Sequence, residues 1–227
     1  MAKQARSLIT RESILRAAGS VFAELSYTAA TLGDVVTEAG VTQGSLYFHF
    51  DSKHQLASEV IERQHETALA AVASVSPGAR AIESLVRLSI TIAEQIVTDP
   101  IVRGGMRLST ETPELFPQVA RRPYEDWITT CTALLTDAVD EGDVAAGRDV
   151  VALARFVMSA YTGVQVVSHA LTGWADLYDR LGEMWELVLP TLLVEEKRAD
   201  IAALVALLPA AASMPDDSYN SGARPAP

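Results

Sequence analysis

The chain has 227 residues, of which 49% are hydrophobic and 6% aromatic, and its formal net charge is −11 at pH 7. This length allows one large domain or a small domain joined to a larger one. Because Cys131 is the single cysteine, an internal disulfide is excluded and a reducing cytoplasm is favoured. The first residues lack the apolar core of a signal peptide, and the longest apolar run, residues 201–214, is too short to cross a bilayer. We therefore expect a soluble cytoplasmic protein with no membrane partner.

Residues 10–50 are predicted to form three short helices. Thr10 can cap a first helix that runs to about residue 26. The apolar positions of this helix recur at helical spacing and form an inner stripe of Ile14, Leu15, Ala18, Phe22 and Leu25. The second helix has a similar apolar face, made of Leu32, Val35, Val36 and Ala39.

A glycine turn separates the second helix from the third. Gly40 follows the last periodic residue, where a left-handed backbone is easiest for glycine. Thr42 can then cap the third helix, in which Leu46 and Phe50 lie four residues apart and face inward. A short helix with a polar outer face, braced on a second helix across such a turn, is the helix-turn-helix arrangement. The alternative is an ordinary helical hairpin whose tyrosine and histidine are surface residues.

The outer face of the third helix carries side chains suited to DNA. Gln43 lies in the first turn, where glutamine can pair with an adenine edge, and Gly44 leaves room for close approach to the groove. Ser45 can contact a base or a phosphate, and neighbouring basic, tyrosine and histidine side chains can donate to phosphate oxygens. The expected DNA-binding residues are Thr42, Gln43, Gly44, Ser45, Tyr47, His49, Lys53, Arg6 and Arg11.

The distribution of charge is compatible with DNA binding in spite of the acidic total. Residues 1–60 contain five Lys/Arg and six Asp/Glu, whereas the remaining residues contain 13 and 23. Within the first sixteen residues, four basic side chains are accompanied only by Glu12. The acidic remainder would repel DNA and restrict its approach to one orientation. The small number of basic contacts predicts an affinity that is modest per subunit and sensitive to salt.

Beyond residue 50 the hydrophobic periodicity stays helical and strand signals are missing. A long helix over residues 52–74 would leave the helix-turn-helix and act as a lever on it. The segment 149–171 is apolar almost all round, which predicts burial on more than one side, and Pro190 is expected to break the segment that follows. The other predicted helices cover residues 82–98, 101–108, 124–141, 176–193 and 198–208.

We therefore predict an all-α fold in three parts. Residues 1–50 form a helix-turn-helix DNA-binding domain, and residues 51–214 form a larger helical domain that binds a ligand and a second subunit. The tail at residues 215–227 has the composition of a disordered segment.

The string VTQGSLYFHFDSKHQLA at residues 41–57 resembles the DNA-binding motif of the tetracycline-repressor (TetR) family. The opening MAKQAR, the LYFHF segment and GVQVVS at residues 163–168 further resemble the γ-butyrolactone autoregulator receptors of actinobacteria. This resemblance implies a dimeric repressor that binds palindromic operator DNA and is released by a small lipophilic signal. It also implies that the last two long helices form a four-helix dimer interface. The motif residues that match are Thr42, Gly44, Tyr47, His49, Phe50, Lys53 and Leu56.

The same resemblance implies where the ligand binds. Trp127 matches the tryptophan that closes over the ligand in these receptors, and Gln64 matches another pocket position. Tyr161 would add a ring and a hydroxyl donor, with core packing as its alternative role. Two departures matter: Gln43 stands where the receptors usually have lysine, and Ala160 where they often have threonine. These departures bear on the operator sequence and on the ligand, for which a furan, a butenolide or an antibiotic intermediate is an alternative to a simple butyrolactone.

Two other functions are compatible with parts of the sequence. A pseudo-receptor would bind DNA without sensing a small molecule, and a lactone-hydrolysing enzyme would turn its ligand over. The chain contains no G-x-S-x-G, H-E-x-x-H or phosphate-binding glycine loop, and His49 and His54 are poorly spaced for one metal ion. Cys131 is expected to be a buried structural thiol. We therefore expect neither catalysis nor a cofactor.

Overall fold

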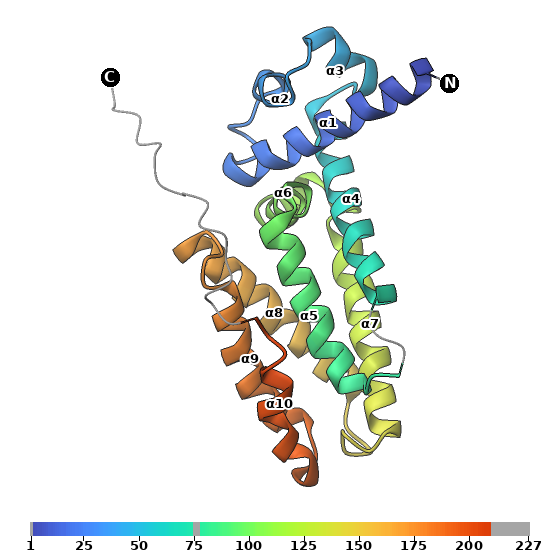
Figure 1. Ribbon diagram of the computed structural model, residues 1–227, viewed down its shortest axis with the longest axis vertical. Coiled ribbons are helices and arrows are strands. Elements are labelled where there is room, and N and C mark those ends of the chain that lie inside the picture. The colour runs from blue at the N-terminus through green and yellow to red at the C-terminus, as the bar shows by residue number, and fades with distance from the viewer. Residues whose placement is uncertain (1, 75–77, 210–227) are drawn as a thin grey trace. The chain divides into compact units, whose positions relative to one another are not determined.

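The computed structural model describes residues 2–74 and 78–209, and the predicted tail at 215–227 lies outside them. In this part of the chain the regular elements are helices, together with an isolated bridge between Val144 and Leu193 (Figure 1), which confirms the all-α prediction. The chain divides into two compact units. The first contains residues 1–79 and 91–130, and the second contains residues 80–90 and 131–227. The division falls inside two helices, α5 (Ala81–Thr98) and α7 (Arg121–Asp140).

The first unit contains the predicted helix-turn-helix. The helices α2 (Leu32–Ala39) and α3 (Gln43–His49) pack against α1 (Ala2–Glu24) (Figure 1). Gly40 ends α2 with a φ of 63°, in the left-handed region. Thr42 caps α3 by accepting a hydrogen bond of 3.2 Å from the amide of Ser45. The side chains of Leu46 and Phe50 are fully buried, so the predicted turn and inner face are confirmed.

The start of α1 differs from the prediction. The helix begins at Ala2 rather than at Thr10, and the Thr10 hydroxyl donates to the carbonyl of Arg6 at 3.0 Å, a bond made within the helix. The cap expected at Thr10 is therefore wrong, because residues 2–9 contain no proline or glycine to stop the helix from extending. Leu25 follows the end of the helix and is exposed, so it does not belong to the inner stripe.

The core of the first three helices is completed by later parts of the chain. The helices α4 (Lys53–Ser74) and α6 (Pro100–Glu111) contact each other and α1 within this unit. The backbones of α1 and α6 nearly touch, since a Cβ on Gly104 would lie 2.4 Å from the carbonyl oxygen of Gly19. The short helix η1 (Pro113–Leu115) then leads to Phe116 and Ala120, which join the same buried cluster as Leu46.

The second unit contains a helical hairpin near the end of the chain. The helices α8 (Val150–Thr172) and α9 (Leu177–Leu192) lie side by side (Figure 1). Pro190 lies inside α9 and does not break it, contrary to the prediction. Pro190 lacks the N–H for one backbone hydrogen bond and its ring crowds the carbonyl four residues earlier, but only two residues of α9 follow it, so the disturbance falls near the end of the helix. The predicted helix at 198–208 is replaced by η2 (Glu195–Asp200) and α10 (Ile201–Val205), which pack against α9.

Within a single chain, α8 is buried on one side. Its buried residues recur every three or four positions and lie on one face, whereas Phe156, Val166, Val167 and Leu171 are exposed in this chain. The second apolar side is therefore open. Among the described residues, α8 is the one helix that is long and apolar enough to span a bilayer by length and composition alone, and its exposed apolar side accounts for much of that hydropathy. The core helix of a soluble protein meets the same criterion.

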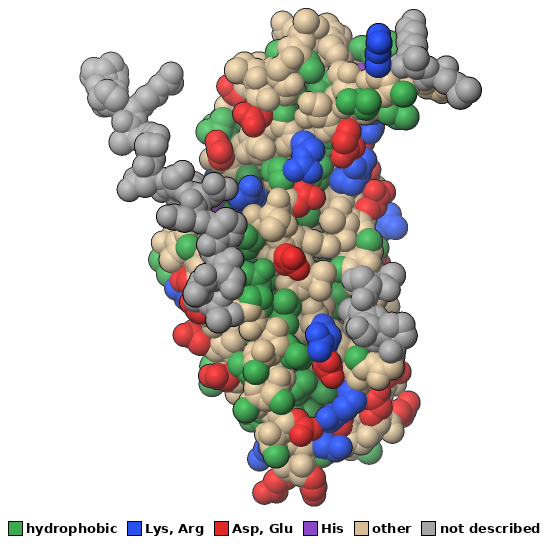
Figure 2. All heavy atoms as spheres, viewed as in Figure 1, with side chains coloured by type: hydrophobic (Ala, Val, Ile, Leu, Met, Phe, Trp, Pro, Cys, Tyr) green, Lys and Arg blue, Asp and Glu red, His purple; other side chains and the backbone are tan. Residues whose placement is uncertain are grey.

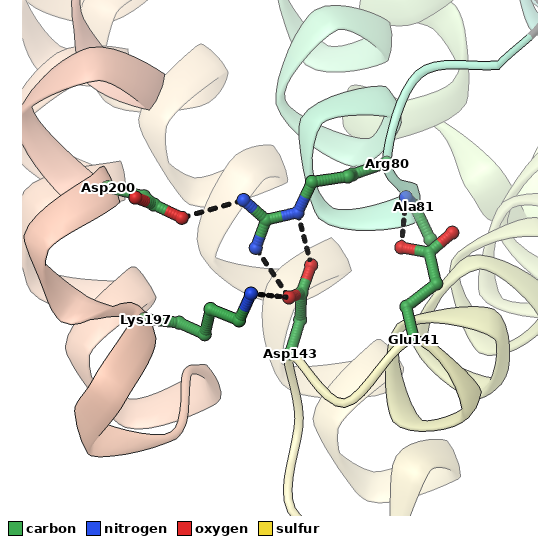
Figure 3. Close-up of polar contacts among 6 residues, drawn as sticks. All are labelled: Arg80, Ala81, Glu141, Asp143, Lys197 and Asp200. Atoms are coloured by element: carbon green, nitrogen blue, oxygen red, sulfur yellow. Dashed lines mark hydrogen bonds and ion pairs between the residues drawn. The ribbon is translucent and has the colours of Figure 1, made fainter.

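A cluster of charged residues fastens the C-terminal segment of the second unit (Figure 3). Asp143, in the connection between α7 and α8, is 1% exposed and accepts two hydrogen bonds from the guanidinium of Arg80. Arg80 also donates to Asp200 at 2.6 Å, and the ammonium of Lys197 lies 3.8 Å from Asp143. Beside them, Glu141 accepts a hydrogen bond from the amide of Ala81 at 2.9 Å. Side chains from three segments thus hold η2 and α10 to the start of α5.

Candidate DNA interface and ligand-binding residues

The predicted DNA-contacting residues of α3 lie on its outer face. Gln43, Gly44 and Tyr47 are exposed, while Ser45 and His49 are half-buried at its edges. Apart from its chain neighbours and the nearby backbone of α3, no atom of the described residues lies within 4 Å of the position that a Cβ on Gly44 would take. On the face shown in Figure 2, the surface over α2 and α3 consists mainly of uncharged polar and backbone atoms. This surface is suited to reading DNA by hydrogen bonds and shape rather than by a dense basic patch.

Phe48 is an exposed residue that the sequence reasoning did not assign. Its side chain is 78% exposed, and it stands four residues after Gly44 and one after Tyr47, on the same outer face. Its ring meets that of His49 edge-on, with centroids 5.0 Å apart. An exposed aromatic ring on a recognition helix can contact the methyl group of thymine. The signal was present in the sequence, because helical spacing from Leu46 and Phe50 leaves position 48 outside.

The basic residues of the predicted interface have different surroundings. Arg6 is exposed on the first turns of α1. Arg11 pairs with Glu59 and lies over the ring of Phe50, 5.1 Å from its centroid. The ammonium of Lys53 donates to the carbonyls of Tyr27 and Ala30 at 2.8 and 2.9 Å. Lys53 therefore stabilises the connection before α2 in the free protein, and a phosphate contact would require it to exchange those bonds.

Two of the predicted ligand-binding residues lie in the first unit. Gln64 on α4 and Trp127 on α7 are both buried. Their neighbours in sequence, His65 and Asp126, join the two helices through a hydrogen bond of 2.8 Å between His65 Nε2 and Asp126 Oδ2. A Cβ on Gly105 would lie 2.5 Å from the Cβ of Gln64, so α6 also approaches α4 closely at this level.

The third predicted ligand residue, Tyr161, belongs to the second unit. Its side chain is buried, and its hydroxyl donates to the carbonyl of Ser89 at 3.0 Å. Burial raises the pKa of this hydroxyl well above its usual value. The indole of Trp185 donates to the Ser89 hydroxyl at 2.9 Å. This arrangement gives Tyr161 a core-packing role in the free chain.

The structure bears on two features that could support catalysis, a reactive thiol and a metal site. Cys131 is buried as predicted, and burial raises the pKa of its thiol to about 11, so the nucleophilic thiolate is disfavoured at neutral pH. Within residues 2–74 and 78–209, no group of three His, Cys, Asp or Glu side chains is placed to hold a metal ion.

A capped helix-turn-helix whose second helix presents polar side chains outward, followed by a larger helical part, defines a DNA-binding transcriptional regulator. Residues 14–60 match the model of bacterial regulatory proteins of the tetR family, and residues 79–194 match the tetracyclin repressor-like C-terminal domain. The chain belongs to the TetR family of transcriptional repressors.

Similar proteins narrow this assignment. The A-factor receptor protein of Streptomyces griseus is 33% identical over 211 residues, which cover 89% of this chain and 74% of that protein. A crystal structure of a gamma-butyrolactone receptor (ArpA like protein) is 32% identical, with a TM-score of 0.78, covering 89% of this chain and 97% of the other. CprB from Streptomyces coelicolor, in complex with its biological operator sequence, is 32% identical with a TM-score of 0.76 over the same shares of both chains. The chain thus resembles γ-butyrolactone receptors along most of its length.

Variants of α3 should separate base reading from phosphate contact. We expect Gln43→Ala to change which operator bases are preferred, because the amide that would pair with a base edge is lost. Tyr47→Phe should weaken binding to all sequences by a similar factor, because it removes a phosphate contact. Fluorescence anisotropy on a panel of single-base operator variants measures both. An equal loss on every operator with Gln43→Ala would show that Gln43 does not read a base.

Proposed function

We propose that this protein is a transcriptional repressor that binds a palindromic operator as a homodimer and is released by a small γ-butyrolactone-like ligand. The outer face of α3 carries the DNA-binding half of this proposal, because its capped helix offers Gln43, Gly44, Tyr47 and Phe48 to a major groove. Similarity to the A-factor receptor protein and to γ-butyrolactone receptor structures supports the ligand half.

Dimerisation is supported by the open apolar side of α8 and α9. Leu187 on α9 is 76% exposed, and the exposed apolar residues of α8 belong to the same unit. Large exposed apolar side chains gathered on neighbouring helices are typical of an interface. A two-fold dimer would place two recognition helices about 34–36 Å apart, one turn of DNA, and would explain why a palindrome is read.

Leu187→Glu is expected to shift the protein from dimer to monomer, because it would place two carboxylates in an apolar interface. Sedimentation velocity at micromolar concentration measures the change, and operator binding should fall with it. Exposed Leu115→Glu, in the other unit, is a matched control that should leave the dimer intact. A dimer that survives Leu187→Glu would exclude this part of α9 from the interface.

Release by the ligand requires a difference in ligand affinity between two states of the protein. We propose that the ligand contacts Gln64 on α4 and Trp127 on α7, with Tyr161 as a further candidate. Because α4 follows the recognition helix after a connection of residues 50–52, a shift of α4 would change the distance between the two recognition helices of a dimer. A tenfold loss of DNA affinity requires about 1.4 kcal/mol of coupling.

The function is tested by a gel-shift assay of the purified protein on DNA from upstream of its own gene. The assay is run with and without a lipophilic extract of the source culture, and then with synthetic γ-butyrolactones. We expect a shifted band that the extract abolishes. A band that persists under all additions would support a pseudo-receptor, whereas disappearance of the lactone by hydrolysis would support an enzyme. No band at low salt on any upstream fragment would contradict the repressor itself.

A further inference from the structure

The hydrogen bond between His65 and Asp126 joins α4 to α7 inside the first unit. His65 is 5% exposed, and its Nε2 lies 2.8 Å from Asp126 Oδ2. Asp126 is more open, and the guanidinium of Arg122 lies 3.6 Å from the same oxygen. An ionised carboxylate can only accept hydrogen bonds, so Nε2 is the nitrogen that carries the proton.

The second nitrogen of this imidazole has no partner. His65 Nδ1 is fully buried and makes no hydrogen bond among the described residues. In the neutral ring with its proton on Nε2, Nδ1 bears a lone pair and acts only as an acceptor. A buried acceptor without a donor costs free energy, and buried polar groups in proteins nearly always have a partner. His65 is therefore prepared to accept a hydrogen bond that the protein itself does not supply.

Two residues next to this pair carry side chains that can donate hydrogen bonds. Gln64 precedes His65 on α4, and Trp127 follows Asp126 on α7. Both residues are buried, and their side chains carry N–H groups that can donate a hydrogen bond. Side chains with N–H donors thus occur on the same two helices that the bond between His65 and Asp126 joins. A ligand with one donor and one carbonyl acceptor would satisfy both kinds of group.

We propose that His65 is a ligand-recognising residue that accepts a hydrogen bond from a hydroxyl group of the ligand through Nδ1. The ligand is then a hydroxyl-bearing lactone, whose carbonyl takes a donor from Gln64 or Trp127. The ligand hydroxyl donates to His65, and His65 donates to Asp126, so that each hydrogen bond polarises the next. Because His65 lies on α4 and Asp126 on α7, the ligand hydroxyl strengthens the hydrogen bond that joins these two helices. This inference rests on the proposed function, since it specifies the ligand of the same site.

Two substitutions at position 65 separate the two nitrogens. The side-chain amide of His65→Gln reaches the place of Nε2 and keeps donation to Asp126, but it offers no acceptor at the place of Nδ1. The amide oxygen of His65→Asn occupies the place of Nδ1 and keeps the acceptor, but it no longer reaches Asp126. Each variant therefore serves as the control for the other.

The probes are two synthetic γ-butyrolactones that differ only in a side-chain hydroxyl, present in one and oxidised to a ketone in the other. We expect the hydroxy-lactone to release the wild-type protein from its operator at a concentration at least tenfold lower than the ketone. His65→Gln should remove this preference while leaving ligand-free operator affinity unchanged, and His65→Asn should retain it. Equal release of the wild type by both lactones, or a full preference in His65→Gln, would overturn the role of His65. Release by neither lactone from an operator that is still bound would overturn the proposed function itself.

A measurement on the wild-type chain covers the case in which a variant does not fold. In protein labelled with ¹⁵N-histidine, the Nδ1 resonance of His65 should move upfield when the hydroxy-lactone binds, because its lone pair accepts a hydrogen bond. The ketone should not cause this shift. An Nδ1 resonance that stays unchanged when the site is saturated with the hydroxy-lactone would contradict the inference.

Discussion

Asp143→Ala is expected to lower the free energy of unfolding by about 2–3 kcal/mol, the largest loss of stability that we predict for one side chain in the second unit. Removing one partner of a buried ion pair costs roughly 3–5 kcal/mol, because the other charge is left uncompensated. The loss here should be smaller, since the Arg80 side chain is 37% exposed and keeps its bond to Asp200. Urea unfolding followed by circular dichroism, at one fixed protein concentration, measures the change.

Acid is also expected to lower the stability that the cluster of Arg80, Asp143 and Asp200 provides. The hydrogen bond from Arg80 lowers the pKa of Asp200 below its usual value, so the ionised form is favoured in the folded state. Its contribution to stability is complete above the unfolded pKa of about 3.9 and is lost as the pH falls through the folded value. Bonds to Asp143, and then to Asp200, raise the pKa of Arg80, so the arginine stays charged throughout.

The exposed pair Arg121–Glu125 provides the control for Asp143→Ala. Its side chains are 76% and 55% exposed, and such surface pairs contribute less than about 1 kcal/mol. Arg121→Ala should therefore change the urea midpoint little. If Asp143→Ala and Arg121→Ala had equal effects, the cluster would not be what holds η2 and α10 in place.

The parts of the fold that local sequence specifies could be predicted. Gly40 and Thr42 fix the turn of the helix-turn-helix through their own backbone preferences and hydrogen bonds to near neighbours. The spacing of Leu46 and Phe50 marks the inner face of α3 because it is repeated within one helical turn. Local sequence was a poor guide where a residue suits two positions. Thr10 can cap a helix, but its hydroxyl instead donates to the carbonyl of Arg6 within a helix that begins at Ala2.

Contacts between distant residues could not be predicted in the same way. Lys53 looks like a phosphate contact in sequence, but its ammonium reaches back to the carbonyls of Tyr27 and Ala30. The pairs His65–Asp126 and Arg80–Asp143 are separated by about sixty residues and follow from packing rather than from any local pattern. The apolar sequence of α8 predicts burial on more than one side, but hydropathy alone does not state whether the covering surface belongs to the same chain or to a second subunit.

Packing within the first unit gives the proposed ligand residues a second connection to the DNA-binding helices. Phe116, just before α7, is buried in their core, where its ring stacks on His54 and meets Tyr27 edge-on. His54 Nε2 also lies 3.0 Å from the carbonyl oxygen of Leu115. The segment that leads into α7 thus contacts the start of α4 through His54, while Asp126 within α7 bonds to His65, later on α4. A ligand that moved α7 would act on α4 at both points.

Gly44→Ala is expected to weaken operator binding at least tenfold, about 1.4 kcal/mol, while leaving the fold as stable as before or more so. Glycine in a helix is less favourable than alanine by up to about 1 kcal/mol. Apart from the nearby backbone of α3 itself, no described atom lies within 4 Å of the new methyl group. Folding therefore gives no reason for a glycine here. The remaining reason for a glycine at this position is that DNA approaches closely, because Gly44 lies on the outer face of α3 between Gln43 and Phe48.

Gly33→Ala is the matched control, because Gly33 is the second residue of α2 as Gly44 is the second residue of α3. A Cβ on Gly33 makes only an ordinary contact of 3.4 Å with Thr31, so stability should again be unchanged or higher. Gly104→Ala should behave oppositely and lose stability, since its methyl group would meet the backbone of Gly19. Anisotropy titrations and thermal unfolding of the three variants test this pattern. Because only Gly44 faces outward on α3, a loss of operator affinity confined to Gly44→Ala, without a loss of stability, would place DNA against this residue. Unchanged affinity would mean that α3 does not enter the groove by this face.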